Sequence, residues 1–179
     1  MATDTVTFFF ALLAITGQAA LAGLVGLRVT SSPGWSAVRD ALRPLLPWFA
    51  VVVSVTCTAG SLYLSEVAHF RPCRLCWAQR GFMYPLVAVT LYAAIRRSRS
   101  ARTIVIAASL CGGLVSTYHV LLEHFPNLES GTCDPNNPCS LIWVRQLGYV
   151  TIPVMALTGF SLLAAAMLLQ RSLSGRSAS

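Results

Sequence analysis

The sequence contains no lysine, and charged residues of all kinds make up only 11% of its 179 positions. A soluble domain usually carries about 25% charged and about 45–50% apolar residues. Here 55% of the residues are hydrophobic, which excludes intrinsic disorder and argues against a disulfide-dense secreted domain. The apolar residues lie in blocks longer than a globular core of this size buries. The composition therefore predicts a membrane protein.

Several motifs of known chemistry are also missing. The chain has neither a C-x-x-C-H sequence for haem attachment nor a G-x-G-x-x-G loop for a dinucleotide. Internal repeats are not apparent, and the apolar blocks hold few ionisable residues at their centres, which argues against a transporter. All 13 basic residues are arginines and the net charge is +7, but they are scattered over short loops. That distribution argues against nucleic-acid binding.

Five apolar stretches are long enough to cross a bilayer, which takes about 20 helical residues. They are residues 6–27, 45–64, 77–95, 103–122 and 149–169. Each is expected to be helical, because lipid cannot satisfy backbone donors and acceptors. The first stretch also resembles a signal peptide at Ala20-Leu21-Ala22, although it is long and no basic residue precedes it.

The arginines between these stretches predict the orientation. Nine fall on one side: Arg28, Arg39, Arg43, Arg96, Arg97, Arg99, Arg102, Arg171 and Arg176. Four lie on or near the other side: Arg71, Arg74, Arg80 and Arg145. The positive-inside rule places the nine in the cytoplasm and the N-terminus outside, in a multi-pass protein of the cell membrane.

We therefore predict an all-α membrane protein with a four-helix transmembrane bundle core and one additional N-terminal transmembrane helix. The extra helix and a cytoplasmic loop occupy residues 1–44, the core occupies 45–170, and a cytoplasmic tail occupies 171–179. Pro85 in the third stretch and Pro153 in the fifth are expected to bend their helices, because proline cannot donate a backbone hydrogen bond.

Two cysteine pairs fall on the predicted extracytoplasmic side. Cys73 and Cys76 form the sequence C-R-L-C, and Cys133 and Cys139 bracket five residues rich in turn formers. Structural disulfides closing loops this short stabilise a protein by only about 2 kcal/mol each. Tight, exposed loops are where disulfides exchange readily, so the pattern favours redox exchange.

Two other interpretations of the four cysteines stay open. They could be structural disulfides, which are common on the oxidising side of a membrane. They could also bind zinc in a structural or adaptor protein, although the spacing of Cys133 and Cys139 is unusual for a zinc pair. The remaining cysteines, Cys57 and Cys111, lie within apolar stretches and are expected to pack as small hydrophobic residues.

The surroundings of the first pair suggest an electron acceptor. Cys76 is expected in the first helical turn, where the helix dipole favours a thiolate. Arg80, four residues later, would share its face and stabilise negative charge. With no haem or flavin motif, a membrane quinone, menaquinone or ubiquinone, fits best, and His119 could hydrogen-bond to it or deliver a proton.

These residues resemble a known family. Cys73-Arg74-Leu75-Cys76-Trp77-Ala78-Gln79-Arg80 followed by Met83-Tyr84-Pro85 is similar to the hallmark of the disulfide bond formation protein B family, particularly its Gram-positive BdbC-like branch. Tyr118-His119, the second cysteine pair, Gly148-Tyr149 and Thr151-Ile152-Pro153 follow in the family's order. The resemblance spans roughly residues 45–169.

The resemblance implies a four-helix thiol:quinone oxidoreductase that reoxidises an extracytoplasmic thioredoxin-fold thiol oxidase, DsbA- or BdbD-like. Cys133 would be attacked by the partner's thiol, with Cys139 as its exchange partner. Cys73 would exchange with these loop cysteines, and Cys76 would react with quinone beside Arg80 and near His119. The extra N-terminal helix and a shorter second cysteine loop depart from the best-known members.

A second membrane family, the vitamin K epoxide reductases, also has four core helices and two cysteine pairs. In that family the loop pair precedes the quinone-side C-x-x-C, whereas here C-R-L-C comes first. The order therefore favours the disulfide bond formation protein B family.

Overall fold

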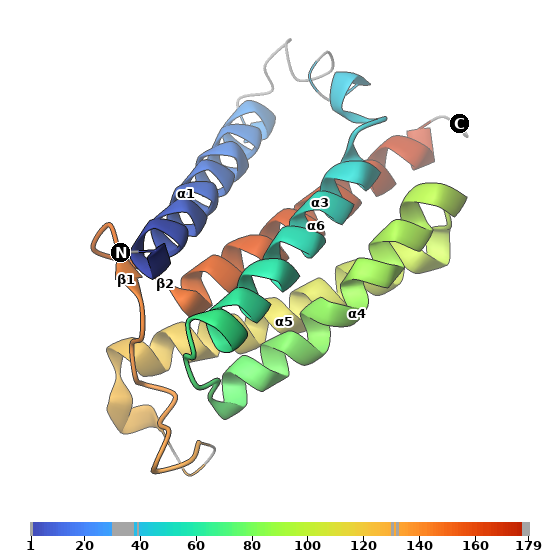
Figure 1. Ribbon diagram of the computed structural model, residues 1–179. Coiled ribbons are helices and arrows are strands. Elements are labelled where there is room, and N and C mark those ends of the chain that lie inside the picture. Colours follow the sequence, from blue (N-terminus) through green and yellow to red (C-terminus); the bar gives the residue numbers. More distant parts are fainter. Residues whose placement is uncertain (1, 30–37, 39, 130, 132, 177–179) are drawn as a thin grey trace.

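Five long helices dominate the computed structural model, which describes residues 2–29, 38, 40–129, 131 and 133–176. They are α1 (Ala2–Val29), α3 (Leu46–Leu62), α4 (Arg74–Arg96), α5 (Arg99–His124) and α6 (Ile152–Arg176) (Figure 1). The predicted all-α class is confirmed. Of the predicted cytoplasmic loop and tail, residues 30–37, Arg39 and residues 177–179 lie outside the described part of the chain.

Short elements connect these helices. A π-helical turn (Tyr63–Val67) extends α3, and a 3-10 turn (Pro126–Leu128) follows α5. Strands β1 (Arg145–Gln146) and β2 (Val150–Thr151) form a small antiparallel hairpin before α6. Leu147 and Gly148, at the turn of this hairpin, have positive φ angles of 50° and 84°.

Four helices of the described chain are long and apolar enough to cross a membrane. These candidate spans are Thr3–Val29, Leu46–Val67, Arg99–His124 and Ile152–Gln170. They correspond to four of the five predicted stretches, the extra N-terminal one included. The other stretch forms α4, whose first half carries the polar residues Gln79, Arg80 and Tyr84, and α4 is not among the four.

The start of α6 corrects one prediction. The fifth stretch was expected to begin at residue 149 and to be bent by Pro153. Instead the helix begins at Ile152 because β2 comes directly before it, and Pro153 is its second residue. A proline in the first turn removes no helical hydrogen bond, so only Pro85 lies inside its helix.

The bundle is held by close packing and by a few buried hydrogen bonds. A central cluster joins α3, α4, α5 and α6 through side chains such as Leu86, Val105 and Phe160. The hydroxyls of Ser54 and Thr90 lie 3.0 Å apart in the interior. Such contacts matter in lipid, where apolar burial alone does not drive helices together.

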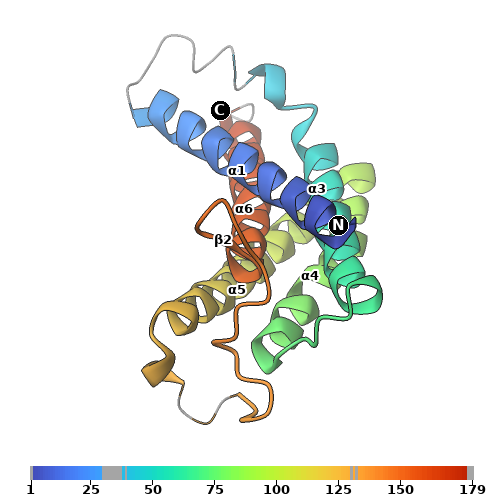
Figure 2. The ribbon, with the colours of Figure 1, turned by 60° about the vertical axis from the view of Figure 1, so that its left-hand side comes forward.

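The N-terminal helix lies against α6 on one side of the bundle (Figures 1 and 2). Ala11 and Ala14 are buried, and a side chain at Gly17 would meet Leu162, so the two helices approach closely. The Gln18 amide donates to the Thr158 hydroxyl at 3.0 Å, and the Tyr149 hydroxyl donates to Gln18 at 2.7 Å. These polar contacts fix the position of α1 on the bundle.

Candidate functional site

The C-R-L-C pair lies at the start of α4. Cys73 is the N-cap residue, and its sulfur accepts a hydrogen bond from the Cys76 backbone N–H at 3.3 Å. The two sulfur atoms lie 2.9 Å apart as free thiols. Because α4 begins at Arg74, Cys76 lies in the first turn as predicted, but the N-cap position facing the helix dipole belongs to Cys73.

This position makes Cys73 the acidic thiol of the pair. The hydrogen bond shared with Cys76 lowers the pKa of Cys73 to about 4, while burial opposes the shift and the His119 ring supports it. Sequence reasoning favoured the thiolate at Cys76 because it took the helix dipole as the main cause. The lowered pKa favours the thiolate form of Cys73, and the thiolate is the form that takes part in disulfide exchange.

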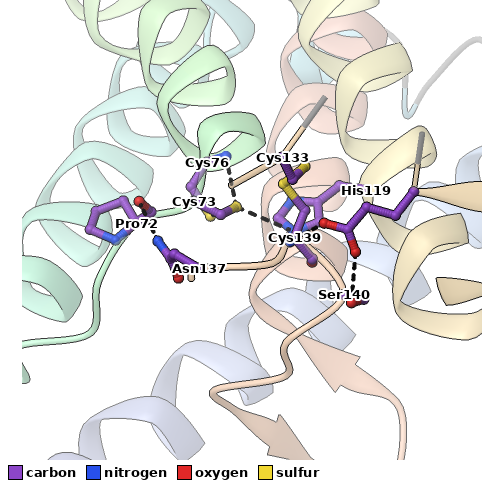
Figure 3. Close-up of a disulfide and its surroundings, with 9 residues drawn as sticks. Pro72, Cys73, Cys76, His119, Cys133, Asn137, Cys139 and Ser140 are labelled. Carbon is purple, nitrogen blue, oxygen red and sulfur yellow. Dashed lines mark hydrogen bonds between the residues drawn. A yellow bond between two sulfur atoms is a disulfide. The ribbon is translucent and has the colours of Figure 1, made fainter. Parts of the chain in front are cut away.

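The second pair is a disulfide, Cys133–Cys139, in the loop after α5 (Figure 3). The predicted turn is present, since the Asn137 backbone N–H donates to the Asp134 carbonyl at 2.9 Å. The Asn137 side chain also donates to the Pro72 carbonyl at 3.2 Å, which ties the loop to the segment before Cys73. Both disulfide cysteines are buried.

Glu129 holds the other end of this loop. Its carboxylate accepts from the Cys139 backbone N–H at 2.8 Å and from the Ser140 hydroxyl at 2.9 Å. Charge-assisted bonds of this kind are roughly twice as strong as neutral ones. The disulfide is thus fixed by hydrogen bonds from two directions.

His119 lies between the two pairs (Figure 3). Its Nε2 is 3.0 Å from the Cys139 carbonyl oxygen and 3.7 Å from the Cys73 sulfur. A carbonyl oxygen only accepts, so Nε2 carries the hydrogen. The ring is buried, and its Nδ1 has no hydrogen-bond partner among the described residues.

The four cysteines predicted as redox-active are therefore brought together. Cys73, Cys133 and Cys139 belong to one buried cluster with Leu75 and Leu122, and Cys76 packs against it. The zinc interpretation needed four thiolates, but Cys133 and Cys139 are joined to each other here. Three possible ligand atoms, on Cys73, Cys76 and His119, do lie within 4.8 Å of one another.

Next to Cys76 an apolar cavity of about 390 Å³ extends between α1, α3, α4 and α6. Cys76 and Arg80 are part of its wall, together with Phe70 and Trp143, whose rings stack at 5.4 Å. Arg80 donates to the Ser61 carbonyl at 2.9 Å and lies 5.1 Å from the centre of the Trp77 ring. Cys73 and His119 are not on this wall.

The family model of disulfide bond formation protein DsbB matches residues 43–170. This chain belongs to the DsbB family. The proteins of the DsbB family are oxidoreductases that generate disulfides. The match to this family excludes the alternative that the chain is a vitamin K epoxide reductase.

Curated relatives support the assignment to the DsbB family. A probable disulfide formation protein of Oceanobacillus iheyensis is 41% identical over 118 residues, which cover 65% of this chain and 79% of the relative. Disulfide bond formation protein C of Bacillus subtilis is 35% identical over 113 residues, 63% of this chain and 82% of the relative. No solved structure matches.

Sequence reasoning missed two features of this DsbB-family site. It did not assign a role to Glu129, because a single acidic residue in a polar loop carries no recognisable spacing. It also did not place α1 beside the cavity, because a uniformly apolar helix gives no sign of which face it buries. Cys57 and Cys111 lie within α3 and α5 as expected, although Cys57 also faces the cavity.

Proposed function

We propose that this protein oxidises the dithiol of an extracytoplasmic thioredoxin-fold thiol oxidase and passes the two electrons to a membrane quinone. The observation that carries this proposal is the position of the C-R-L-C pair. Cys73 faces the loop disulfide through His119, and Cys76 faces the apolar cavity beside Arg80. One turn of helix thus separates a thiol-exchange region from a space suited to a lipid-soluble acceptor.

The sulfur chemistry consists of two exchanges. A partner thiolate attacks Cys133 and forms a mixed disulfide, Cys139 leaves as a thiolate, and the partner's second thiol then releases Cys133 as its own disulfide forms. The reduced loop pair next attacks an oxidised C-R-L-C pair at Cys73, which restores the loop disulfide and leaves Cys73 and Cys76 as thiols. In the structure the four cysteines have the redox states expected after this second exchange, with the loop pair oxidised and the helix pair reduced.

The chain's residues favour Cys73 as the sulfur that faces the loop. When a loop thiolate attacks Cys73, Cys76 leaves and a mixed disulfide forms. The low pKa of Cys73 makes it a good leaving group in the next step, when the second loop thiol re-forms the loop disulfide and displaces Cys73, because a thiol of lower pKa leaves faster. His119 donates toward both the Cys139 carbonyl and the Cys73 sulfur, so it holds the two reacting segments next to one another.

The cavity fits a quinone in size, polarity and charge. Drug-sized ligands occupy mostly apolar pockets of roughly 300–1,000 Å³ with a few polar groups that orient them. The Arg80 guanidinium and the Cys76 thiol are polar groups on this wall, and most of the remaining lining is apolar. A bound quinone would supply a two-electron acceptor, and Arg80 would stabilise negative charge that develops on its oxygen.

The proposal also includes the orientation predicted from the arginines, with both cysteine pairs outside the cell. It requires α4 to cross the bilayer, and α4 packs between α3 and α5 along the bundle. Labelling of intact cells with an impermeant maleimide tests this part. Label on reduced Cys133 or Cys139 without lysis is expected, and label only after lysis would contradict it.

Anaerobic mixing with a reduced thioredoxin-fold thiol oxidase and quinone tests the reaction itself. We expect one quinol to form for each partner disulfide that forms. The absorbance of the quinone measures the amount of quinol. Partner oxidation without quinol, or no oxidation at all, would contradict the proposed function.

A further inference from the structure

The cavity has a wall that does not belong to the DsbB-family core. The family model begins at residue 43, whereas α1 ends at Val29. Six residues of α1 nevertheless line the cavity: Phe10, Leu13, Ala14, Thr16, Gly17 and Ala20. Their spacing of three and four residues places them on one helical face, so α1 presents a continuous stripe to this space.

We propose that α1 is part of the quinone-binding site of this chain and that Phe10 closes the site by packing on Gly60 of α3. This inference rests on the proposed function and adds to it a binding surface outside the family core. The ligand class follows from the wall itself: a ring with an apolar tail, whose polar end lies at Arg80 and Cys76.

The contact between Phe10 and Gly60 is the point where α1 reaches α3. A Cβ atom placed on Gly60 would lie 3.0 Å from two ring carbons of Phe10, closer than ordinary van der Waals contact. The absence of a side chain at Gly60 therefore lets the aromatic ring lie directly on the α3 backbone. Without the ring, α1 and α3 would lose this contact at the cavity wall.

The remaining contacts hold α1 in place rather than leaving it to slide in lipid. Gln18 is bonded to Thr158 of α6 and to Tyr149 before it, and Gln146 donates to the Thr7 hydroxyl at 3.0 Å. Three side-chain bonds therefore tie α1 to α6 and to the hairpin that precedes it. These three hydrogen bonds keep α1 at a fixed position, as a wall of a binding site requires.

The rims of the cavity favour entry of its ligand from the bilayer. Leu13 on α1 and Phe49 and Val52 on α3 line the cavity, yet all three are also exposed on the bundle surface. Both helices are candidate membrane spans, so this opening faces lipid. A quinone dissolved in the membrane would meet the opening directly.

Quinone binding by the full-length protein in nanodiscs tests the inference. The probe is decylubiquinone, and binding is followed by quenching of tryptophan fluorescence, to which Trp143 on the cavity wall contributes. Phe10→Ala should raise the Kd for decylubiquinone at least fivefold. Phe8→Ala is the matched control, since Phe8 is exposed and absent from the cavity wall, and it should leave the Kd within twofold.

A photoreactive azidoquinone with a decyl tail gives a second measurement that needs no variant. Peptide mapping of the wild type should find label within residues 10–20, and excess decylubiquinone should remove it. An unchanged Kd in Phe10→Ala, or label confined to residues 46–170, would overturn the inference.

Failure of the proposed function can be told apart from failure of this inference. A wild-type protein that binds neither decylubiquinone nor a short-chain menaquinone analogue overturns both, and that result is obtained before α1 is altered. In contrast, a wild type that binds decylubiquinone and is indifferent to Phe10→Ala overturns only the role of α1.

Discussion

The two ends of the C-R-L-C pair differ in how they are built. On the side of Cys73, a disulfide loop is fixed by hydrogen bonds that Glu129 accepts and that His119 and Asn137 donate. On the side of Cys76, packing among α1, α3, α4 and α6 surrounds an apolar cavity whose wall includes Arg80 one helical turn after the thiol and Arg71 before it. Thiol exchange requires fixed sulfur positions, whereas a lipid-soluble acceptor requires space and apolar walls. The comparison indicates that a single turn of α4 joins two different kinds of site.

The largest effect is expected from Cys73→Ser, which should separate partner oxidation by the loop from quinone reduction at the cavity. Removing this sulfur should lower quinone reduction by at least about a thousandfold, because no Cys73–Cys76 disulfide can form to accept electrons from the loop thiols. The loop disulfide should still oxidise one equivalent of partner dithiol. Stopped-flow quinone absorbance and a thiol assay measure the two outcomes. Sustained quinone reduction by Cys73→Ser would contradict the assignment of Cys73 to thiol exchange.

Arg80→Met should damage only the cavity end. Loss of a charged group that stabilises developing negative charge lowers quinone reduction by about a hundredfold. Arg80→Lys should recover part of the rate because it keeps the charge without the planar guanidinium. The rate of the first exchange with the partner, measured without quinone, should stay at the wild-type value, and a parallel fall in both rates would assign Arg80 to the loop end instead.

His119→Gln should shift the pH dependence of the exchange end. The ring lowers the pKa of Cys73, so its loss should raise that pKa above about 4. The Cys73 thiolate is present above its pKa and is lost as the pH falls through it, so the midpoint of iodoacetamide labelling should move to higher pH.

His124→Gln is the matched control for this experiment, because His124 lies on the same helix but is exposed and bonds to the Val120 carbonyl. A midpoint that moves equally in both variants would contradict the assigned position of His119.

Glu129→Gln should loosen the loop without touching the cavity. Loss of the carboxylate charge weakens two hydrogen bonds, each worth about 1.5–3 kcal/mol when charged. Hydrogen exchange at the Cys139 amide, which donates to Glu129, should become about tenfold faster. Glu66→Gln, at an exposed position in the turn after α3, should leave that amide unchanged, and unchanged exchange in Glu129→Gln would remove this residue from the loop's support.

The smallest effect is expected from Cys111→Ser. Cys111 is a free, exposed cysteine within α5, away from both ends of the pair. Quinone reduction should stay within twofold of the wild type in the coupled assay. A larger loss would mean that the four cysteines are not the complete redox path.

The sequence predicted the parts of this molecule that follow from period and spacing. Apolar length located the helices, and the C-R-L-C motif with Arg80 placed the first pair on a helix N-terminus. The turn formers between Cys133 and Cys139 predicted the short loop that the disulfide closes. Each of these features depends on residues that are close in the sequence, so it could be predicted without knowing the three-dimensional structure.

Contacts between distant segments could not be derived in this way. Glu129 reaches Cys139, Asn137 reaches Pro72, and Phe10 reaches Gly60 only after the helices have packed. The acidity of Cys73 also depends on the hydrogen bond within the pair and on His119, and the dipole alone pointed to Cys76. His119 was expected near the quinone, and the structure places it between the cysteine pairs, so its role at the quinone stays a prediction.

The central claim is that Cys73 can exchange directly with the loop pair, and a disulfide trap tests it most directly. The double variant Cys76→Ser, Cys133→Ser leaves one thiol in each pair. Under mild oxidation, mass spectrometry of peptides should find Cys73 joined to Cys139 within one chain in most molecules. Cys73 and Cys139 that stay unlinked, or that link only between chains, would contradict the account.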